Sequence, residues 1–396
     1  MKLVITLEHR FNRTPDGAVW TQTQFPYPFW VRYLDVFEQV RVVARILDVS
    51  SVPSDWVRAD GVGVTFLAVP YYIGPWQFWL KRKQIIQVVT NAVDRKDAVI
   101  VRLGSSIGSC LLTKLHQTGH PYAAEVVADP YDVLSPNSVN HPLRPFFRWW
   151  FPQQLRDQCA RACAALYVTK EALQRRYPCP QYSVGVSDVD LPDEAFAASP
   201  RPYSEKEGPF HILFVGTMAQ LYKAPDVLIH AVAHCVKDGL DLKLTLIGDG
   251  KHRSELETQA ASLGLEKRIC FLGQLSAGKA VRAQLDQADL FVMPSYQEGL
   301  PRAMVEAMAR ALPCIGSTVG GIPELLMPED MVSPSDANEL ASKIRKVVTD
   351  PERMNQMSIR NLEKAKEYRN EVLDMQRSKF YQYVREKTEA RISQQF

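Results

Sequence analysis

The stretch that decides the fold is PSYQEGLPRAMVEAMARALPCIGSTVGGIPEL, residues 294–325. It holds two glutamates, Glu298 and Glu306, with seven residues between them. Proline is favoured at the first helical position, because its missing N–H would have no partner there anyway, so the pattern predicts a helix that begins at Pro301. We therefore expect Glu298 in the loop before this helix and Glu306 more than one turn inside it.

The start of this helix is a candidate phosphate site. The backbone N–H groups of Gly299 and Leu300 would point off the helix N-terminus, where the positive end of the helix dipole favours anions. Eight helical steps would separate the two carboxylates by about 12 Å, too far for the paired acid and base of a glycosidase. A carboxylate accepts hydrogen bonds from two vicinal hydroxyls, so one glutamate could hold a ribose and the other a hexose. The alternative is that both glutamates simply cap and solvate a helix.

Outside this stretch, short apolar runs of strand length alternate with longer segments of helical period. This alternation is typical of parallel sheets covered by helices on both faces, so we predict an α/β protein. The expected strands of the first half are 2–7, 40–47, 64–69, 98–103, 123–128, 165–168 and 182–186, and those of the second half are 211–215, 243–247, 269–272, 290–293 and 313–316.

A linker divides the chain, which has 396 residues and is long enough for two domains. The segment DEAFAASPRPYSEKEGPF holds three prolines, several charges and little apolar periodicity. We place the first domain at 1–200, the linker at 201–209 and the second domain at 210–370. The remaining segment, 371–396, is predicted to be a helix that crosses back toward the first domain.

Composition excludes several classes of protein. With 46% hydrophobic and 23% charged residues, the chain is globular rather than disordered. A net charge of +3 is too balanced for a protein that neutralises many phosphates, so no nucleic-acid partner is expected. An odd number of cysteines, no signal-peptide core and no apolar run of ~18 residues predict a cytoplasmic location. Four cysteines with apolar neighbours are expected to be small core residues: Cys110, Cys235, Cys270 and Cys314.

Glu298 and Glu306 resemble the glutamate-x7-glutamate signature of retaining glycosyltransferases of family four. Four other blocks resemble that family and stand in the same order along the chain. They are HILFVGTMAQLYKAPDVLIHAV from residue 211, LTLIGDG ending at Gly250, ICFLGQL around Gly273, and GGIPEL from Gly320. The resemblance implies the GT-B fold, in which two Rossmann-like domains face a deep cleft. It also implies transfer of a sugar from a nucleotide sugar, with a UDP- or GDP-sugar expected, to a hydroxyl acceptor with retention of anomeric configuration.

The resemblance further implies which residues form the site. Lys223 and the helix start would stabilise the leaving diphosphate, so no metal or other cofactor is expected. The loop RTPDGAVW is similar to the glycine-containing loop that closes over the donor. Alone, most of the glycines could be turn residues and Lys223 a solvated lysine. The implied catalytic residues are Asp129, Lys223 and Glu298. The implied donor-binding residues are Gly17, Gly216, Thr217, Lys223, Gly248, Glu298, Gly299, Leu300, Pro301 and Glu306.

The sequence departs from the family pattern at two positions. Thr217 stands where the family usually has arginine, and a hydroxyl cannot replace a guanidinium on a phosphate, so diphosphate affinity must rest on Lys223, the helix terminus or another cation. Many members carry a histidine where this chain has Asp129, which could orient a hydroxyl, act as a base, or merely cap a turn at Pro130. Arg102 is a candidate cation for a phosphate or an acidic acceptor, or part of a structural ion pair. A non-catalytic, sugar-nucleotide-binding partner in a polysaccharide assembly complex is therefore the alternative function.

Other motifs in the sequence suggest different functions. GQLSAGKA has phosphate-loop spacing, but Ala280 stands where a serine or threonine must hold magnesium, which argues against an ATPase. Asp188 and Asp190 match a short metal-binding motif of other glycosyltransferases, but they precede the linker of a chain with a different expected fold. Two stretches, 71–83 and 143–156, are rich in aromatic and basic residues. Their aromatic side chains either pack in the core or form a surface that docks on the inner face of a membrane, where the protein would reach a lipid-linked acceptor.

Overall fold

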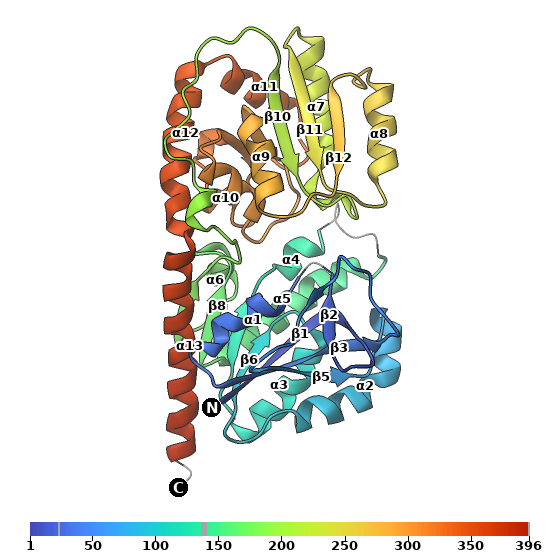
Figure 1. The fold of residues 1–396 in the computed structure, drawn as a ribbon, viewed down its shortest axis with the longest axis vertical. Helices are drawn as coiled ribbons and strands as arrows, with labels where there is room; N and C mark the ends of the chain where they lie inside the picture. The colour runs from blue at the N-terminus through green and yellow to red at the C-terminus, as the bar shows by residue number, and fades with distance from the viewer. Residues whose placement is uncertain (23, 136–140, 395–396) are drawn as a thin grey trace.

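The computed structural model describes residues 1–22, 24–135 and 141–394. Two α/β units are stacked along its longest axis, the N-terminal one below the C-terminal one in Figure 1. The strands are β1 (Lys2–Arg13), β2 (Val19–Thr21), β3 (Gln39–Asp48), β4 (Val57–Arg58), β5 (Val64–Val69), β6 (Ala98–Arg102), β7 (Ala123–Val126), β8 (Ala164–Tyr167), β9 (Tyr182–Gly185), β10 (Phe210–Val215), β11 (Leu242–Ile247), β12 (Ile269–Gly273), β13 (Leu290–Met293), β14 (Cys314–Ser317) and β15 (Met331–Val332).

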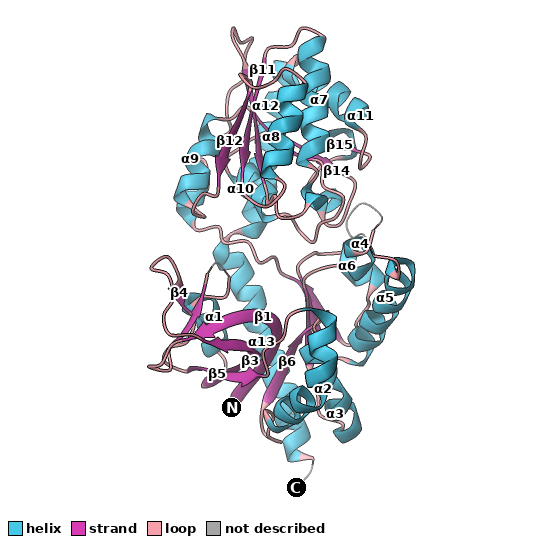
Figure 2. Ribbon diagram, turned by 90° about the vertical axis from the view of Figure 1, so that its right-hand side faces the viewer, coloured by secondary structure: helices cyan, strands magenta, loops and turns pink. Residues whose placement is uncertain are grey.

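Helices cover both faces of the two sheets (Figure 2). The α-helices are α1 (Tyr27–Leu34), α2 (Gly74–Asn91), α3 (Ser106–Thr118), α4 (Pro130–Val133), α5 (Arg144–Arg161), α6 (Ala172–Arg176), α7 (Pro225–Lys237), α8 (Arg253–Ser262), α9 (Lys279–Gln287), α10 (Arg302–Ala309), α11 (Ala337–Val348), α12 (Pro351–Ala365) and α13 (Asn370–Ser393). Short 3-10 helices are η1 (Asp193–Ala195), η2 (Leu221–Lys223), η3 (Ile322–Glu324), η4 (Pro328–Asp330) and η5 (Lys366–Tyr368).

The first sheet contains β1 to β9. Its parallel strands run in the order β5-β3-β1-β6-β7-β8-β9, and the antiparallel strands β2 and β4 extend it beside the far end of β1. Strand β1 is longer than the sequence predicts, because a register shift between Thr6 and Arg10 lets it continue pairing with β3. Strands β2 and β4, with three and two residues, are too short to leave a periodic signal.

The second sheet contains β10 to β15, all parallel, in the order β12-β11-β10-β13-β14-β15. Its strand order reverses between β10 and β13, and ligands of open α/β sheets bind beyond the carboxyl ends of the strands at such a point. The central strand β13 is buried at every residue because helices cover both of its faces. The expectation for Cys270 is wrong: this residue is exposed, because β12 is an edge strand.

The C-terminal helix α13 joins the two units. It packs against α1, β6 and β8 of the first unit, and it runs down one side of the molecule (Figure 1, red). Phe380 and Tyr381 are fully buried there, and the ring of Tyr381 lies 4.6 Å from that of Tyr33. Residues 395–396 of the expected segment lie outside the described residues.

Candidate active site

Glu298 is held by a set of partly buried hydrogen bonds at the carboxyl end of β13. Its Oε1 accepts from Nζ of Lys223 at 2.6 Å and from Oγ of Ser295 at 2.7 Å. Oγ of Ser317 in turn donates to the carbonyl of Ser295 at 2.5 Å, and both serines are fully buried. These serines are not predicted from the sequence, because their only signal is a hydroxyl at or just beyond the end of an apolar strand. Together they fix the direction of the Glu298 carboxylate.

Glycines let the loops around Lys223 approach closely. A Cβ atom at Gly248 would lie 1.9 Å from the carbonyl oxygen of Gly216, and Gly248 also has a positive φ of 136°. A Cβ atom at Gly216 would lie 3.2 Å from Cγ of Lys223. The loops after β10 and β11 are therefore packed backbone to backbone, and this packing brings the Lys223 stem toward Glu298.

Helix α10 begins one residue later than predicted. Pro301 is its N-cap, with φ −74° and ψ 104°, and the Pro301 carbonyl accepts from the backbone N–H of Met304 at 3.1 Å. The prediction of Pro301 as the first helical residue is wrong because its ψ is extended, and only the steps from Arg302 onward are helical. Within the described chain, the N–H groups of Gly299 and Leu300 donate to no protein acceptor, so they are available to a ligand at this helix start.

Glu306 lies one turn inside α10 and is mostly shielded from solvent. Burial raises the pKa of its carboxyl, an effect that Arg302 and Arg282 partly offset. Among the hydrogen bonds and ion pairs of the described residues, none involves this carboxylate. A shielded carboxylate without a partner lowers the stability of the folded protein. Such a position is typical of a carboxylate that binds the hydroxyl groups of a ligand.

Asp129 has the structural role that the sequence left open. It caps α4 by accepting from the backbone N–H of Tyr131 at 2.9 Å. The same carboxylate pairs with Arg176 and accepts from the hydroxyl of Tyr177, and the residue is 6% exposed. Asp129 as a base stays a prediction, and it requires the carboxylate to leave Arg176.

Arg102 and Asp188 belong to one ion-pair network. Arg102 lies 3.1 Å from Glu125 and 2.8 Å from Asp188, and Asp188 also lies 3.6 Å from Arg32. Although burial alone would raise the pKa of Asp188, the two arginines hold it well below its usual range. Arg102 thus forms a structural ion pair with Asp188.

In the described ranges, no group of three or more His, Cys, Asp or Glu residues could hold a metal ion.

Two other predicted donor-binding residues have local roles. Oγ1 of Thr217 accepts from the backbone N–H of Ala219 at 3.1 Å, so this hydroxyl shapes the loop after β10. Gly17 lies in the turn between β1 and β2 with φ 85°, and its N–H donates to the carbonyl of Thr14 at 2.9 Å. The left-handed conformation explains glycine at this position. Contact of either residue with the donor stays a prediction.

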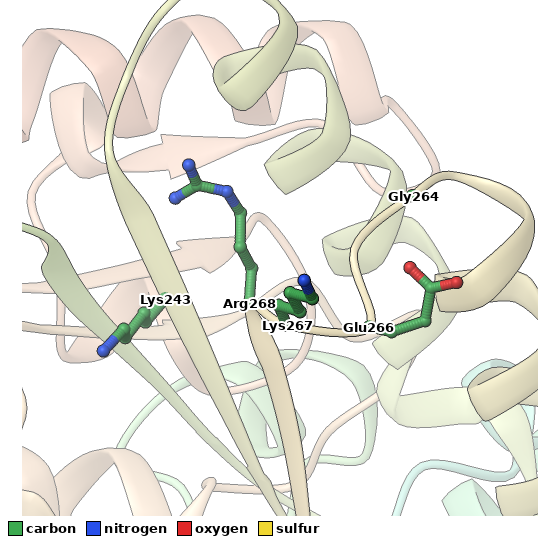
Figure 3. A pocket seen from close by; sticks show the side chains of 5 residues that line it. All are labelled: Lys243, Gly264, Glu266, Lys267 and Arg268. Carbon is green, nitrogen blue, oxygen red and sulfur yellow. The ribbon is translucent and has the colours of Figure 1, made fainter.

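A separate pocket lies away from this site (Figure 3). It is at the amino-terminal ends of β11 and β12, whereas Glu298 follows the carboxyl end of β13. One of its cations, Arg268, already pairs with Asp241 at 2.5 Å. The lining residues are Lys243, Gly264, Glu266, Lys267 and Arg268.

Comparison with known proteins agrees with this geometry. The family model described as "Glycosyl transferases group 1" matches residues 196–364, which include Gly216, Lys223, Glu298 and Glu306. The second unit of the chain therefore belongs to the group 1 glycosyltransferases. The expected GT-B fold is confirmed by solved structures: HepE of Anabaena, in complex with UDP and glucose, aligns with a TM-score of 0.64 at 15% identity, covering 96% of this chain and 98% of that one.

Curated relatives of this chain match it over different lengths. Protein CapJ of Staphylococcus aureus is 23% identical over 370 residues, which cover 90% of this chain and 89% of CapJ. The amylovoran biosynthesis glycosyltransferase AmsK of Erwinia amylovora is 31% identical over 154 residues, 37% of each chain. Among the described helices of this chain, none combines the length and apolar character needed to span a bilayer.

Proposed function

We propose that this chain is a retaining glycosyltransferase that moves a sugar from a UDP- or GDP-sugar to a hydroxyl acceptor in polysaccharide or glycolipid assembly. The observation that carries the proposal is the pair of carboxylates at the switch point of the second sheet: Glu298 fixed by Lys223 and Ser295, and Glu306 shielded and unpartnered. The UDP and glucose in HepE favour a UDP-sugar, and the name of AmsK favours a biosynthetic role.

Each group has a defined task in this mechanism. The diphosphate lies on the free N–H groups of Gly299 and Leu300 and near the Lys223 ammonium, which stabilise the charge that develops on the leaving group. Glu306 accepts hydrogen bonds from the ribose hydroxyls, and Glu298 accepts from a hydroxyl of the transferred sugar. The bond between the sugar and the diphosphate breaks as the acceptor oxygen bonds to the same sugar face. The acceptor proton leaves with the diphosphate or with a base.

A specific observation favours the second candidate, a non-catalytic sugar-nucleotide-binding partner. Thr217 uses its hydroxyl in the turn to Ala219 and brings no positive charge to the diphosphate. Asp129, in the slot of the usual histidine, is bound by Arg176. Such a protein would bind the donor on Lys223 and Glu306 without turnover.

Incubation with UDP- and GDP-sugars in excess EDTA tests the proposal. We expect slow donor hydrolysis without an acceptor, with the released sugar first appearing in the anomeric configuration of the donor, as followed by NMR. Activity should survive EDTA because Lys223 and the backbone N–H groups supply the electrophilic contacts. An inverted product, or activity that is lost in EDTA and restored by Mn²⁺, would contradict this mechanism. Donor binding without turnover would establish the non-catalytic alternative.

We also propose that the acceptor is carried by a membrane lipid. Several tryptophan and phenylalanine side chains of the two basic stretches are largely exposed, with Trp76 at 75%, Trp79 at 66% and Trp149 at 62%, whereas Tyr72 is buried in the core. Phe146 stacks on Trp150, with ring centroids 6.2 Å apart, so the α5 aromatics form one continuous patch. Arg82 and Lys83 are exposed beside the α2 cluster. Aromatic rings with flanking cations match the headgroup region of an anionic leaflet.

The two clusters lie on the same side of the first sheet. Helices α2, α3 and α5 share one core cluster, to which Ile85, Leu111 and Leu155 contribute, and Figure 2 shows them together. Both α2 and α5 follow parallel strands, so their first turns lie at the carboxyl edge of the sheet, the edge that faces the second unit. A membrane at these helix starts would therefore deliver an acceptor headgroup toward the donor site.

Sedimentation with vesicles that contain anionic lipid tests this docking. We expect binding at low ionic strength that weakens in high salt, since each cation near an anionic leaflet contributes about 1 kcal/mol. Replacing Trp76, Trp79 and Trp149 by serine should abolish it. Arg148 is left intact because its guanidinium packs 3.9 Å from the ring of Tyr131. A variant at a remote surface, Lys243→Ser, serves as the control. Absence of low-salt binding, or binding by the triple variant, would contradict the proposal.

A further inference from the structure

One carboxylate of the second unit binds three backbone groups of the first. Glu324, at the end of η3, accepts from the N–H groups of Lys170 at 2.6 Å, Glu171 at 3.0 Å and Ala172 at 2.7 Å. These donors lie at the start of α6. A single side chain therefore connects the loop after β14 with the loop after β8.

Helix α6 needs this acceptor because it has no cap of its own. Its N-cap residue, Glu171, makes no side-chain capping hydrogen bond. The first N–H groups of a helix have no intrahelical partner, and a carboxylate that accepts from them makes charge-assisted hydrogen bonds. The first unit thus provides no acceptor for these N–H groups. Glu324, which lies 154 residues from Lys170 in the sequence, accepts from them instead.

The same segment is fixed to the donor site. The N–H of Gly321 donates to the carbonyl of Gly299 at 2.7 Å, and the N–H of Glu324 donates to the carbonyl of Gly321 at 3.1 Å. A Cβ atom at Gly320 would lie 2.0 Å from the carbonyl oxygen of Glu298. The loop of Glu298 and the GGIPE segment therefore move as one packed body.

This body also touches the first unit directly. A Cβ atom at Gly299 would lie 2.8 Å from the carbonyl oxygen of Val127, just beyond β7. A Cβ atom at Gly321 would lie 3.1 Å from Cγ2 of Thr169, just beyond β8. The carboxyl ends of strands from both sheets thus meet at this point, within a few residues of Glu298.

We infer that Glu324 is a positioning residue: its hydrogen bonds to residues 170–172 set the Glu298–Gly299 loop against the first unit, and so set the distance between the bound donor and the acceptor. This role rests on the proposed function. The neighbouring Lys170–Glu367 ion pair is exposed on both sides and contributes little, so Glu324 is the stronger of these two polar contacts between the units. Lys223, Glu298 and Glu306 all belong to the second unit, so donor binding alone does not depend on Glu324.

The test compares Glu324→Ala and the milder Glu324→Gln with a matched control, Lys170→Ala, which removes the adjacent ion pair and keeps the three backbone donors. Hydrogen–deuterium exchange of peptides that span residues 170–172 reports the contact without any activity. We expect faster exchange there in Glu324→Ala, a smaller increase in Glu324→Gln, and none in the control.

Activity separates positioning from simple structural support. We expect Glu324→Ala to lower kcat for transfer by roughly 10- to 100-fold, because small misplacements of reacting groups cost that much. The donor dissociation constant by calorimetry should stay within about twofold, and the ratio of donor hydrolysis to transfer should rise. Unchanged exchange at residues 170–172, or donor affinity that falls as much as kcat, would overturn the inference. A wild-type protein without turnover would refute the proposed function instead, while the exchange result would still decide whether the contact exists.

Discussion

Replacing Lys223 by alanine is expected to lower kcat for sugar transfer by about 100-fold or more. Its ammonium is the cation that the structure places next to the Glu298 carboxylate, at 2.6 Å, and Glu298 directly precedes the free N–H groups of Gly299 and Leu300 in the chain. Removing one preorganised group that stabilises developing negative charge typically costs about 10²–10³ in kcat. Steady-state transfer with a saturating UDP-sugar measures the effect.

A stability measurement separates this loss from unfolding. Lys223→Ala leaves Glu298, whose side chain is 6% exposed, without its cation, and breaking a buried pair by removing one partner costs about 3–5 kcal/mol. The double variant Lys223→Ala/Glu298→Gln removes the unpaired charge, so it should regain part of the lost stability and none of the activity. A fully active, folded Lys223→Ala protein would show that the diphosphate is stabilised elsewhere.

Replacing Glu306 by alanine is expected to weaken nucleotide-sugar affinity tenfold or more. The carboxylate is shielded and has no protein partner in the described structure, so its acceptor capacity is available to the ribose hydroxyls. Each hydrogen bond to a charged group contributes about 1.5–3 kcal/mol. Calorimetry measures the change, with the exposed and distant Glu266→Ala as the matched control. Unchanged affinity in a folded Glu306→Ala protein would remove Glu306 from the site.

The raised pKa of Glu306 gives this prediction a pH dependence. Only the ionised carboxylate can accept from both ribose hydroxyls, so donor affinity should fall on acidification, starting above the usual glutamate range. Without donor, the stability contribution of a group with a raised folded pKa is present below its unfolded pKa and lost as the pH rises through the folded value. Glu306→Ala should therefore show a flat affinity profile and a higher Tm than wild type at neutral pH.

The sequence alone determined the α/β class and the two glutamates of the site. Strands such as β5 and β13 were predicted to the residue, because continuous apolar runs between turn residues are local signals. The spacing of Glu298 and Glu306 is also local, since both belong to one loop and helix. Pro301 was placed one residue wrong because the same ring geometry suits both the N-cap and the first helical position.

Only the tertiary structure decided what the isolated side chains do. Arg102 meets Asp188 across 86 residues of sequence, and Lys223 meets Glu298 across 75, so neither pair leaves a local pattern. The exposure of Trp76 and Trp149 depends on which helix face the rest of the fold covers, not on the aromatic run itself. The contact of Glu324 with the start of α6 depends on how the two sheets face each other. Periodicity records only contacts within an element, whereas contacts between distant elements are fixed by the packing of the whole chain.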